Sequence, residues 1–313
     1  MDLKHPWPRR LALATWLSAL PLVVLGSSVT TLRAGMAIDG WWVLDRGDGD
    51  HFLFAYPIEK WCANVGTFTE HTHRLFGALV GLLSIALVLA VQRAKAGAQR
   101  VRLAWVGLFA VCAQGTIGGF RVLENSPDLA FLHGVFAQAV LAVLAVNVVL
   151  NDTRFLAARA REHAQAASLG RMAKLAIVAV FGQIFLGAWL RHSGSDLALV
   201  AHIAFAALAT GAVITLARGL RETRVPELAR AARQLLWLIL AQVAIGVLTL
   251  VAIVLVSGGF TAEVSAAETI TASAHVLFGA FTLQACVGAA LWIARRLTLR
   301  ESVASPAGAE VAR

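Results

Sequence analysis

The chain has 313 residues, of which 58% are apolar and 14% charged, and its mean hydropathy is +0.73. A soluble domain carries about 25% charged residues, so these values exclude an ordinary soluble protein. The net charge of +9 is explained below by membrane topology and does not indicate a nucleic-acid partner.

Eight stretches without Asp, Glu, Lys or Arg follow one another along the chain. Each approaches or exceeds the roughly 17–25 residues that cross a hydrocarbon core. Because lipid offers backbone groups no water to bond, such segments must be helical. The predicted fold is therefore all-α, a polytopic membrane protein with eight transmembrane helices. The stretches are Leu11–Leu32, Leu75–Gln92, Leu103–Phe120, Leu129–Asn151, Leu175–Leu190, Leu197–Ala217, Gln234–Ala262 and Thr269–Ala294.

The basic residues predict the orientation of these helices. When the connections are assigned alternately to two sides, one side holds 21 lysines and arginines and 7 acids. The other side holds 6 basic and 11 acidic residues. Since basic loops remain in the cytoplasm, we expect a multi-pass protein of the cell (inner) membrane with both termini cytoplasmic.

A polar and basic connection divides the helices into four plus four. We expect a first half (1–151) with a long outer loop (34–69), a cytoplasmic linker (152–174), a second half (175–300) and a disordered tail (301–313). Loops this long inside a compact protein are usually functional.

Short segments recur in the same order in both halves. Leu132-His133-Gly134 resembles Ala274-His275-Val276, and the segment Gln114 to Gly118 resembles Gln242 to Gly246. The pattern predicts two pseudo-repeated four-helix bundles.

Four of the nine histidines lie near the outer start of an even-numbered helix: His73, His133, His202 and His275. They follow the last outer acid by 3 to 7 residues, which places them about 5–10 Å into the membrane. A single helical histidine can be a structural polar group, but four at matched positions favour a ligand role. Two imidazoles from facing helices can hold a haem iron from both sides. We therefore expect cofactor-binding metal ligands in two pairs, His73 with His133 and His202 with His275.

Glu70 lies three residues before His73 and shares its helix face. A carboxylate also suits a helix N-terminus, so its position alone leaves a structural role open. Beside a haem it could take protons from a substrate, whereas His202 has no neighbouring acid or arginine. This asymmetry suggests that the first half performs chemistry and the second only holds a haem.

Arginines stand beside the proposed haem sites. Arg74 follows His73, while Arg33, Arg121 and Arg191 end the first, third and fifth helices on the outer side. They could pair with haem propionates, or they could only anchor the helices at the interface.

Taken together, these residues resemble the haem A synthase family, over essentially the whole transmembrane chain. The similar segments are Glu70 to Leu75-Phe76-Gly77, Gly118-Gly119-Phe120-Arg121 through Leu132-His133-Gly134 to Gln138, Leu186 to Gly194 followed by His202, and the helix of His275. Some members carry two cysteines in the first outer loop, whereas this chain has only Cys62 there, and His71 is an additional histidine beside Glu70.

The resemblance implies an oxidoreductase that converts a methyl group of haem O to formyl, as required for cytochrome oxidase assembly. It implies that His73 and His133 face the substrate porphyrin, that His202 and His275 ligate haem b, and that Glu70 is the catalytic carboxylate. The implied partners are haem O and its product haem A, haem O synthase, an electron donor and membrane lipid. An oligomer is compatible with the sequence, and no nucleic acid is expected.

Two alternatives remain open. A bis-histidine b-type cytochrome would need the four histidines but has no use for Glu70. A transporter would use broken helices or charges at the membrane centre, and the sequence shows neither.

Overall fold

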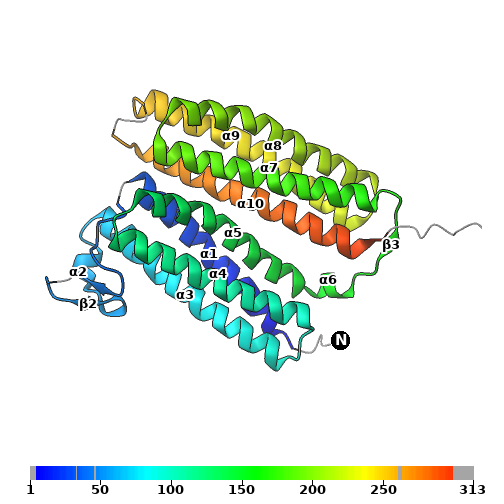
Figure 1. The fold of residues 1–313 in the computed structure, drawn as a ribbon, viewed down its shortest axis with the longest axis horizontal. Helices are drawn as coiled ribbons and strands as arrows, with labels where there is room; N and C mark the ends of the chain where they lie inside the picture. The colour runs from blue at the N-terminus through cyan, green and yellow to red at the C-terminus, as the bar shows by residue number, and fades with distance from the viewer. Residues whose placement is uncertain (1–4, 33, 46, 260–262, 299–313) are drawn as a thin grey trace, which may run out of the picture.

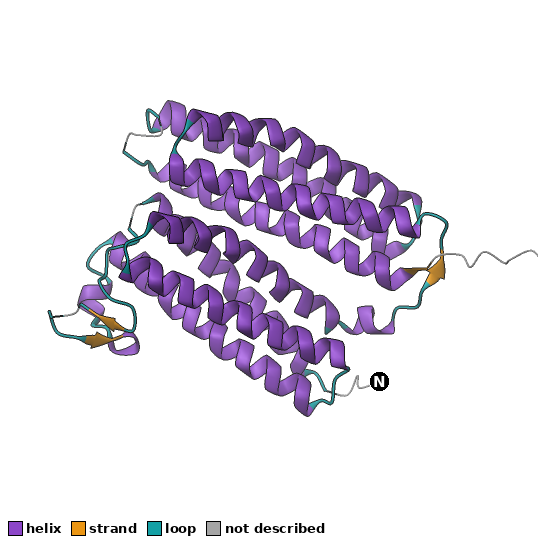
Figure 2. Ribbon diagram, in the orientation of Figure 1, coloured by secondary structure: helices purple, strands orange, loops and turns teal. Residues whose placement is uncertain are grey.

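The computed structural model describes residues 5–32, 34–45, 47–259 and 263–298 and is almost entirely helical (Figure 2). Eight of its helices are long and apolar enough to cross a membrane, which confirms the predicted all-α polytopic fold. The predicted tail 301–313 and Arg33 lie outside the described residues. The long helices are α1 (Trp7–Thr31), α3 (Val65–Arg93), α4 (Ala98–Leu123), α5 (Pro127–Leu150), α7 (Ala166–Ser193), α8 (Asp196–Glu222), α9 (Pro226–Val251) and α10 (Ala266–Arg296).

Short elements occupy the connections. The strands pair as β1 with β2, antiparallel, and β3 with β4, parallel. The π-helix η2 directly continues α9. The short elements are β1 (Val43–Leu44), β2 (His51–Phe52), η1 (Leu53–Ala55), α2 (Ile58–Trp61), α6 (Thr153–Ala157), β3 (Arg161–Glu162), η2 (Ala252–Val256) and β4 (Leu297–Thr298).

The four histidine-bearing helices each begin with a side-chain cap. The side chain of Asn64 accepts a hydrogen bond from the backbone of Thr67 at the start of α3. Serines do the same at the start of the other three, namely Ser126 for α5, Ser195 for α8 and Ser265 for α10. Each cap satisfies one free backbone N–H and fixes the residue at which the helix begins. The caps thereby set how far each histidine lies from the start of its helix.

Helix α7 begins at residue 166 and not at 175, where the charge-free stretch begins. Residues 166–174 of the expected linker are therefore helical. The absence of charge locates the lipid-spanning part of a helix, but Arg171 and Lys174 can continue the helix beyond it. Their long side chains place the charge in water while the backbone remains helical.

The long helices form two groups of four (Figure 1). In the first group α1 packs on α3, α3 on α4, α4 on α5, and α5 closes the ring on α1. Helices α7 to α10 form the same closed ring, and α1 and α5 contact α7 or α10 between the groups. Across this boundary Trp16 of α1 donates a hydrogen bond of 2.6 Å to Gln284 of α10.

The two ends of the molecule differ. The start of α1 and the end of α10 lie at one end, and residues 34–64 lie at the other, which we call the long-loop end (Figure 1). The largest buried apolar cluster draws on residues 166–184, 212–220, 225–239 and 283–297, all remote from the long-loop end. Tight apolar packing therefore concentrates away from the histidines.

Candidate functional site: two imidazole pairs

The structure brings the four histidines together in two pairs. The ring centres of His73 on α3 and His133 on α5 are 6.4 Å apart, and their planes are inclined by 71°. The ring centres of His202 on α8 and His275 on α10 are 6.2 Å apart, with an angle of 72°. The two halves thus build nearly the same arrangement from different helices.

These distances suit one metal ion between each pair of rings. Imidazole–metal bonds of about 2.0–2.1 Å place two opposed nitrogens about 4 Å apart and the ring centres about 6 Å apart. Within the described parts of the chain, no group of three or more His, Cys, Asp or Glu side chains converges as a metal site would require. A metal whose remaining ligands come from a porphyrin needs only the two axial imidazoles. The residues present therefore fit haem better than a bare metal ion.

A glycine on the preceding long helix lies against each imidazole. A methyl group at Gly118 would lie only 2.7 Å from Cε1 of His133, closer than real methyl contacts. The corresponding distances are 2.8 Å from Gly26 to His73, 2.9 Å from Gly187 to His202 and 2.8 Å from Gly246 to His275. Only glycine leaves room for each ring in this position. No sequence signal tied Gly26 to a histidine.

Glu70 and Arg74 form a buried ion pair near the first imidazole pair. The Nη2 atom of Arg74 lies 2.6 Å from Oε1 of Glu70, whose side chain is 3% exposed. The other carboxylate oxygen, Oε2, accepts a hydrogen bond of 3.0 Å from the backbone N–H of Ile38. Arg74 donates further bonds to the carbonyls of Ile38 and Gly40, at 2.9 and 2.8 Å. The pair thus fastens the long loop onto α3.

The same loop is also fastened to α4. Arg121 donates a hydrogen bond of 2.9 Å to the carbonyl of Gly35. The ring of Trp41 packs directly on Gly119, where no methyl group could be accommodated. Residues 35–41 therefore bridge α3 and α4, the helices that carry His73 and Gly118.

Arg191 lies at the boundary between the two groups of helices. Its guanidinium donates to the hydroxyl of Ser27 at 2.9 Å, to the carbonyl of Ser27 at 2.6 Å, and to the hydroxyl of Thr31. Arg191 thus anchors α7 to the end of α1. Arg121 and Arg191 thus have protein partners, and their pairing with haem propionates stays a prediction.

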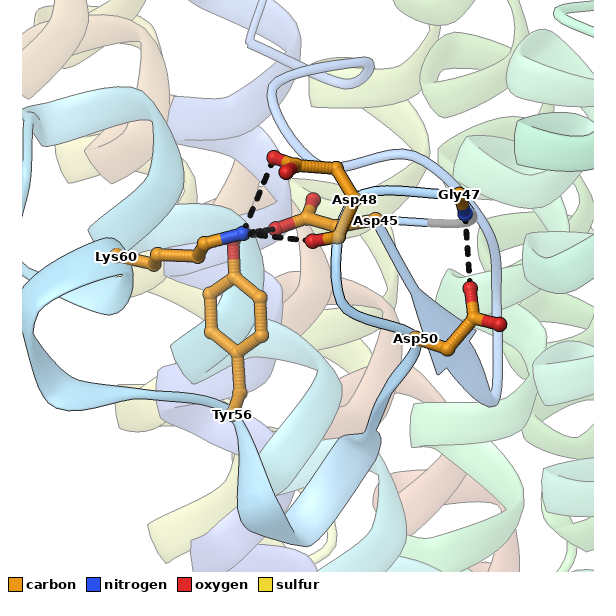
Figure 3. Close-up of polar contacts among 6 residues, drawn as sticks. All are labelled: Asp45, Gly47, Asp48, Asp50, Tyr56 and Lys60. Atoms are coloured by element: carbon orange, nitrogen blue, oxygen red, sulfur yellow. Dashed lines mark hydrogen bonds and ion pairs between the residues drawn. The ribbon is translucent and has the colours of Figure 1, made fainter.

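An exposed charge network organises the rest of the long loop (Figure 3). Lys60 donates to Oδ2 of Asp45 at 2.9 Å and to the carbonyl and carboxylate of Asp48. Tyr56 also donates to Asp45, at 3.2 Å, and burial together with this carboxylate raises the pKa of the Tyr56 hydroxyl. The hydrogen bond to Asp45 likewise raises the pKa of Lys60. This network stabilises the loop without contacting the imidazole pairs.

His71 does not take part in the first pair and packs against the long loop. It is 2% exposed and packs between Tyr56 and Trp61, with ring-centre distances of 4.8 and 5.0 Å. It therefore attaches the long loop to the opposite face of α3 from His73.

Comparison with known proteins connects this arrangement to one family. A family model described as COX15-CtaA, cytochrome oxidase assembly protein, matches residues 59–201, which contain the first imidazole pair, Glu70 and the three arginines. The heme A synthase of Symbiobacterium thermophilum is 32% identical over 197 residues, covering 58% of this chain and 62% of that protein. The heme A synthase of Alkalihalophilus pseudofirmus is 25% identical over 191 residues, covering 59% of each chain.

The matched part of the chain spans about three fifths of the length of these two relatives. The family model ends one residue before His202, so the second imidazole pair rests on the structure itself. The chain is therefore similar, over part of its length, to cytochrome oxidase assembly proteins of the COX15-CtaA type and to two heme A synthases.

Proposed function

We propose that this chain is a haem A synthase-type oxidoreductase of the cell membrane, which converts a methyl group of haem O to formyl. The observation that carries the proposal is the asymmetry between two similar imidazole pairs. Both are spaced for an iron porphyrin, but within the described residues a buried Glu–Arg pair and a fastened loop accompany only the first. In this proposal His73 and His133 hold the substrate porphyrin, and His202 and His275 hold haem b.

The reaction requires electrons and protons to leave the substrate. With water as the oxygen source, conversion of a methyl group to formyl releases four electrons and four protons. A bound haem b supplies one-electron redox chemistry in the adjoining half of the protein. The direct contacts between α1 and α10 bring the two halves together.

Glu70 is the proposed proton acceptor. Its Oε1 lies 2.6 Å from Arg74 and its Oε2 accepts a hydrogen bond from the backbone N–H of Ile38, so both carboxylate oxygens are held in fixed positions. Burial at 3% exposure keeps bulk water from competing. Arg74 and Arg121 hold residues 35–41 across α3 and α4, which would limit the access of water to the substrate porphyrin.

One observation favours a second candidate, a b-type cytochrome that only transfers electrons. Both carboxylate oxygens of Glu70 already have protein partners, so the residue could serve solely to fasten the loop.

We also propose that both termini are cytoplasmic, as the charge distribution suggests. The substrate would come from a haem O synthase, and an external electron acceptor would take up the four electrons that the reaction releases.

Pigment extraction after co-expression with a haem O synthase tests the proposal. Wild-type protein should contain haem b and produce haem A. Glu70→Gln should retain haem but lose about 10²–10⁴-fold in conversion, as expected for a proton-transfer group. Glu268→Gln is the matched control, because Glu268 is an acid in the first turn of α10, the helix that carries His275, and accepts a hydrogen bond from Ser257.

The outcomes separate the candidates. Haem-containing protein that yields no haem A would indicate the electron carrier. Full conversion by Glu70→Gln would remove the catalytic role of this residue. Purified wild-type protein without any haem would exclude both functions.

A further inference from the structure

A glutamine lies four residues before three of the four glycines that face the imidazoles. These are Gln114 before Gly118, Gln183 before Gly187 and Gln242 before Gly246. Four residues make about one helical turn, so the glutamine and the glycine face the same histidine. At the fourth site, before Gly26, the corresponding residue is Leu22.

The glutamine amides contact the imidazoles. The amide nitrogen of Gln114 lies 3.1 Å from Nδ1 of His133 and donates to the carbonyl of the same histidine at 2.9 Å. Gln183 makes both contacts to His202 at the same distances, and its amide nitrogen also lies 3.2 Å from Nε2 of that ring. The amide nitrogen of Gln242 lies 3.3 Å from Nε2 of His275. At the fourth site, Nδ1 of His73 lies 3.0 Å from the carbonyl oxygen of Leu22.

The amide oxygens are buried without a partner. Oε1 of each of the three glutamines has no hydrogen bond within the described part of the chain. A buried acceptor left unpaired costs about 1–3 kcal/mol. Each glutamine therefore carries an unused acceptor beside an imidazole.

Metal binding gives this acceptor a use. A neutral imidazole that binds a metal through Nε2 carries its proton on Nδ1, which then needs an acceptor. The carbonyl of Leu22 already serves His73 in this way. An amide nitrogen cannot accept, but turning the amide over replaces it with the oxygen, and the last side-chain torsion of glutamine is broad.

We propose that Gln114 and Gln183, whose amides both reach Nδ1, are positioning residues that set the orientation and tautomer of His133 and His202. With the amide turned over, which gives up its bond to the histidine carbonyl, the amide oxygen accepts the Nδ1 proton when Nε2 binds iron. Gln242 lies at Nε2 of His275 and is not assigned this role. His73 differs because a backbone acceptor holds it permanently in the tautomer that binds metal. The inference rests on the proposed function, since it needs haem at the imidazole pairs.

Potentiometric titration of purified full-length protein tests this role at Gln183. The redox transition that is missing from the titration curve of the His202→Leu variant is assigned to the haem at the second pair. Gln183→Glu leaves only an acceptor, with a negative charge, which should strengthen the imidazole ligand and lower the midpoint potential. Gln183→Leu should raise the midpoint potential and reduce haem affinity by about 10–100-fold, the usual effect of removing such a partner.

The matched control is Gln284→Leu, since Gln284 is a buried glutamine on α10 that bonds Trp16 and no imidazole. Its midpoint potential should equal that of the wild type. Midpoint potentials that the two Gln183 substitutions shift in opposite directions support the proposal. If the Gln183→Glu protein does not bind haem, a higher midpoint potential in Gln183→Leu alone supports it. Unchanged potentials would overturn the positioning role alone. Wild-type protein without haem would overturn the proposed function as well.

Discussion

The two imidazole pairs have nearly the same internal geometry and very different surroundings. Ring-centre distances of 6.4 and 6.2 Å and plane angles of 71° and 72° recur in the two halves. Among the residues that the structure describes, only the first pair has a buried carboxylate nearby and a loop fastened by two arginines. In the proposed function, the repeated helical unit would hold a porphyrin in each half, and the groups present in the first half alone would account for its chemistry.

Removing one histidine from each half should separate the two sites, and we expect the largest effects here. His133→Leu should abolish conversion of haem O while haem b remains, because the second pair is intact. His275→Leu should instead remove haem b. Pigment analysis of both variants checks this, and loss of all haem in both would show that the pairs do not act as separate sites.

A methyl group under one imidazole should displace that ring. Gly118→Ala would place Cβ 2.7 Å from Cε1 of His133, so we expect a 10–100-fold loss of haem affinity at the first pair only, about the effect of disturbing a metal ligand's support. Gly115→Ala is the matched control, since Gly115 lies on the same helix with open space around it. Equal haem retention in the two variants would contradict the proposed contact.

Loosening the loop should affect only the first half. Arg74→Gln leaves Glu70 buried without its ion-pair partner, which typically costs about 3–5 kcal/mol. We expect faster hydrogen exchange at the amide of Ile38, slower conversion of haem O and unchanged haem b. Exchange of Ile38 at the wild-type rate would indicate that Arg74 does not hold the loop.

Alkaline pH should produce the smallest effect, confined to the outer part of the loop. The folded-state pKa of Lys60 lies above its ordinary value. The stabilisation that its charged side chain gives the loop is therefore complete below the ordinary lysine pKa and is lost as pH rises through the raised pKa. The protection factors of the backbone amides of residues 45 and 47–60 in hydrogen exchange should therefore be constant near neutral pH and decrease in strong alkali. Asp45→Asn should remove this dependence and leave both haem sites unchanged.

Much of the fold was accessible from the sequence because lipid imposes a simple rule on charge-free stretches. The eight spans were predicted for this reason, and the start of α7 was missed because Arg171 and Lys174 continue the helix beyond the lipid. The four histidines were found because they stand at matched positions of a repeat. Their pairing across helices follows from the closed ring of four helices in each half.

The supports of the histidines were harder to predict. Gln114 and Gly118 were matched to Gln242 and Gly246 along the chain, but Gln183 with Gly187 and Leu22 with Gly26 were not. A spacing of four residues is common in helices, so it acquires meaning only when the structure shows that each such helix face meets an imidazole. The contacts of Glu70 with the loop were likewise hidden, because Ile38 and Gly40 participate through backbone atoms.

Electron paramagnetic resonance of the oxidised, purified protein examines both pairs at once. Imidazole planes inclined by 71° and 72° should give low-spin ferric signals with the large g-maximum typical of nearly perpendicular axial imidazoles. The His133→Leu and His275→Leu variants should each lose one such signal. High-spin signals that neither substitution changes would contradict ligation by the two pairs. Rhombic signals typical of parallel imidazoles would contradict the arrangement of the rings in the structure.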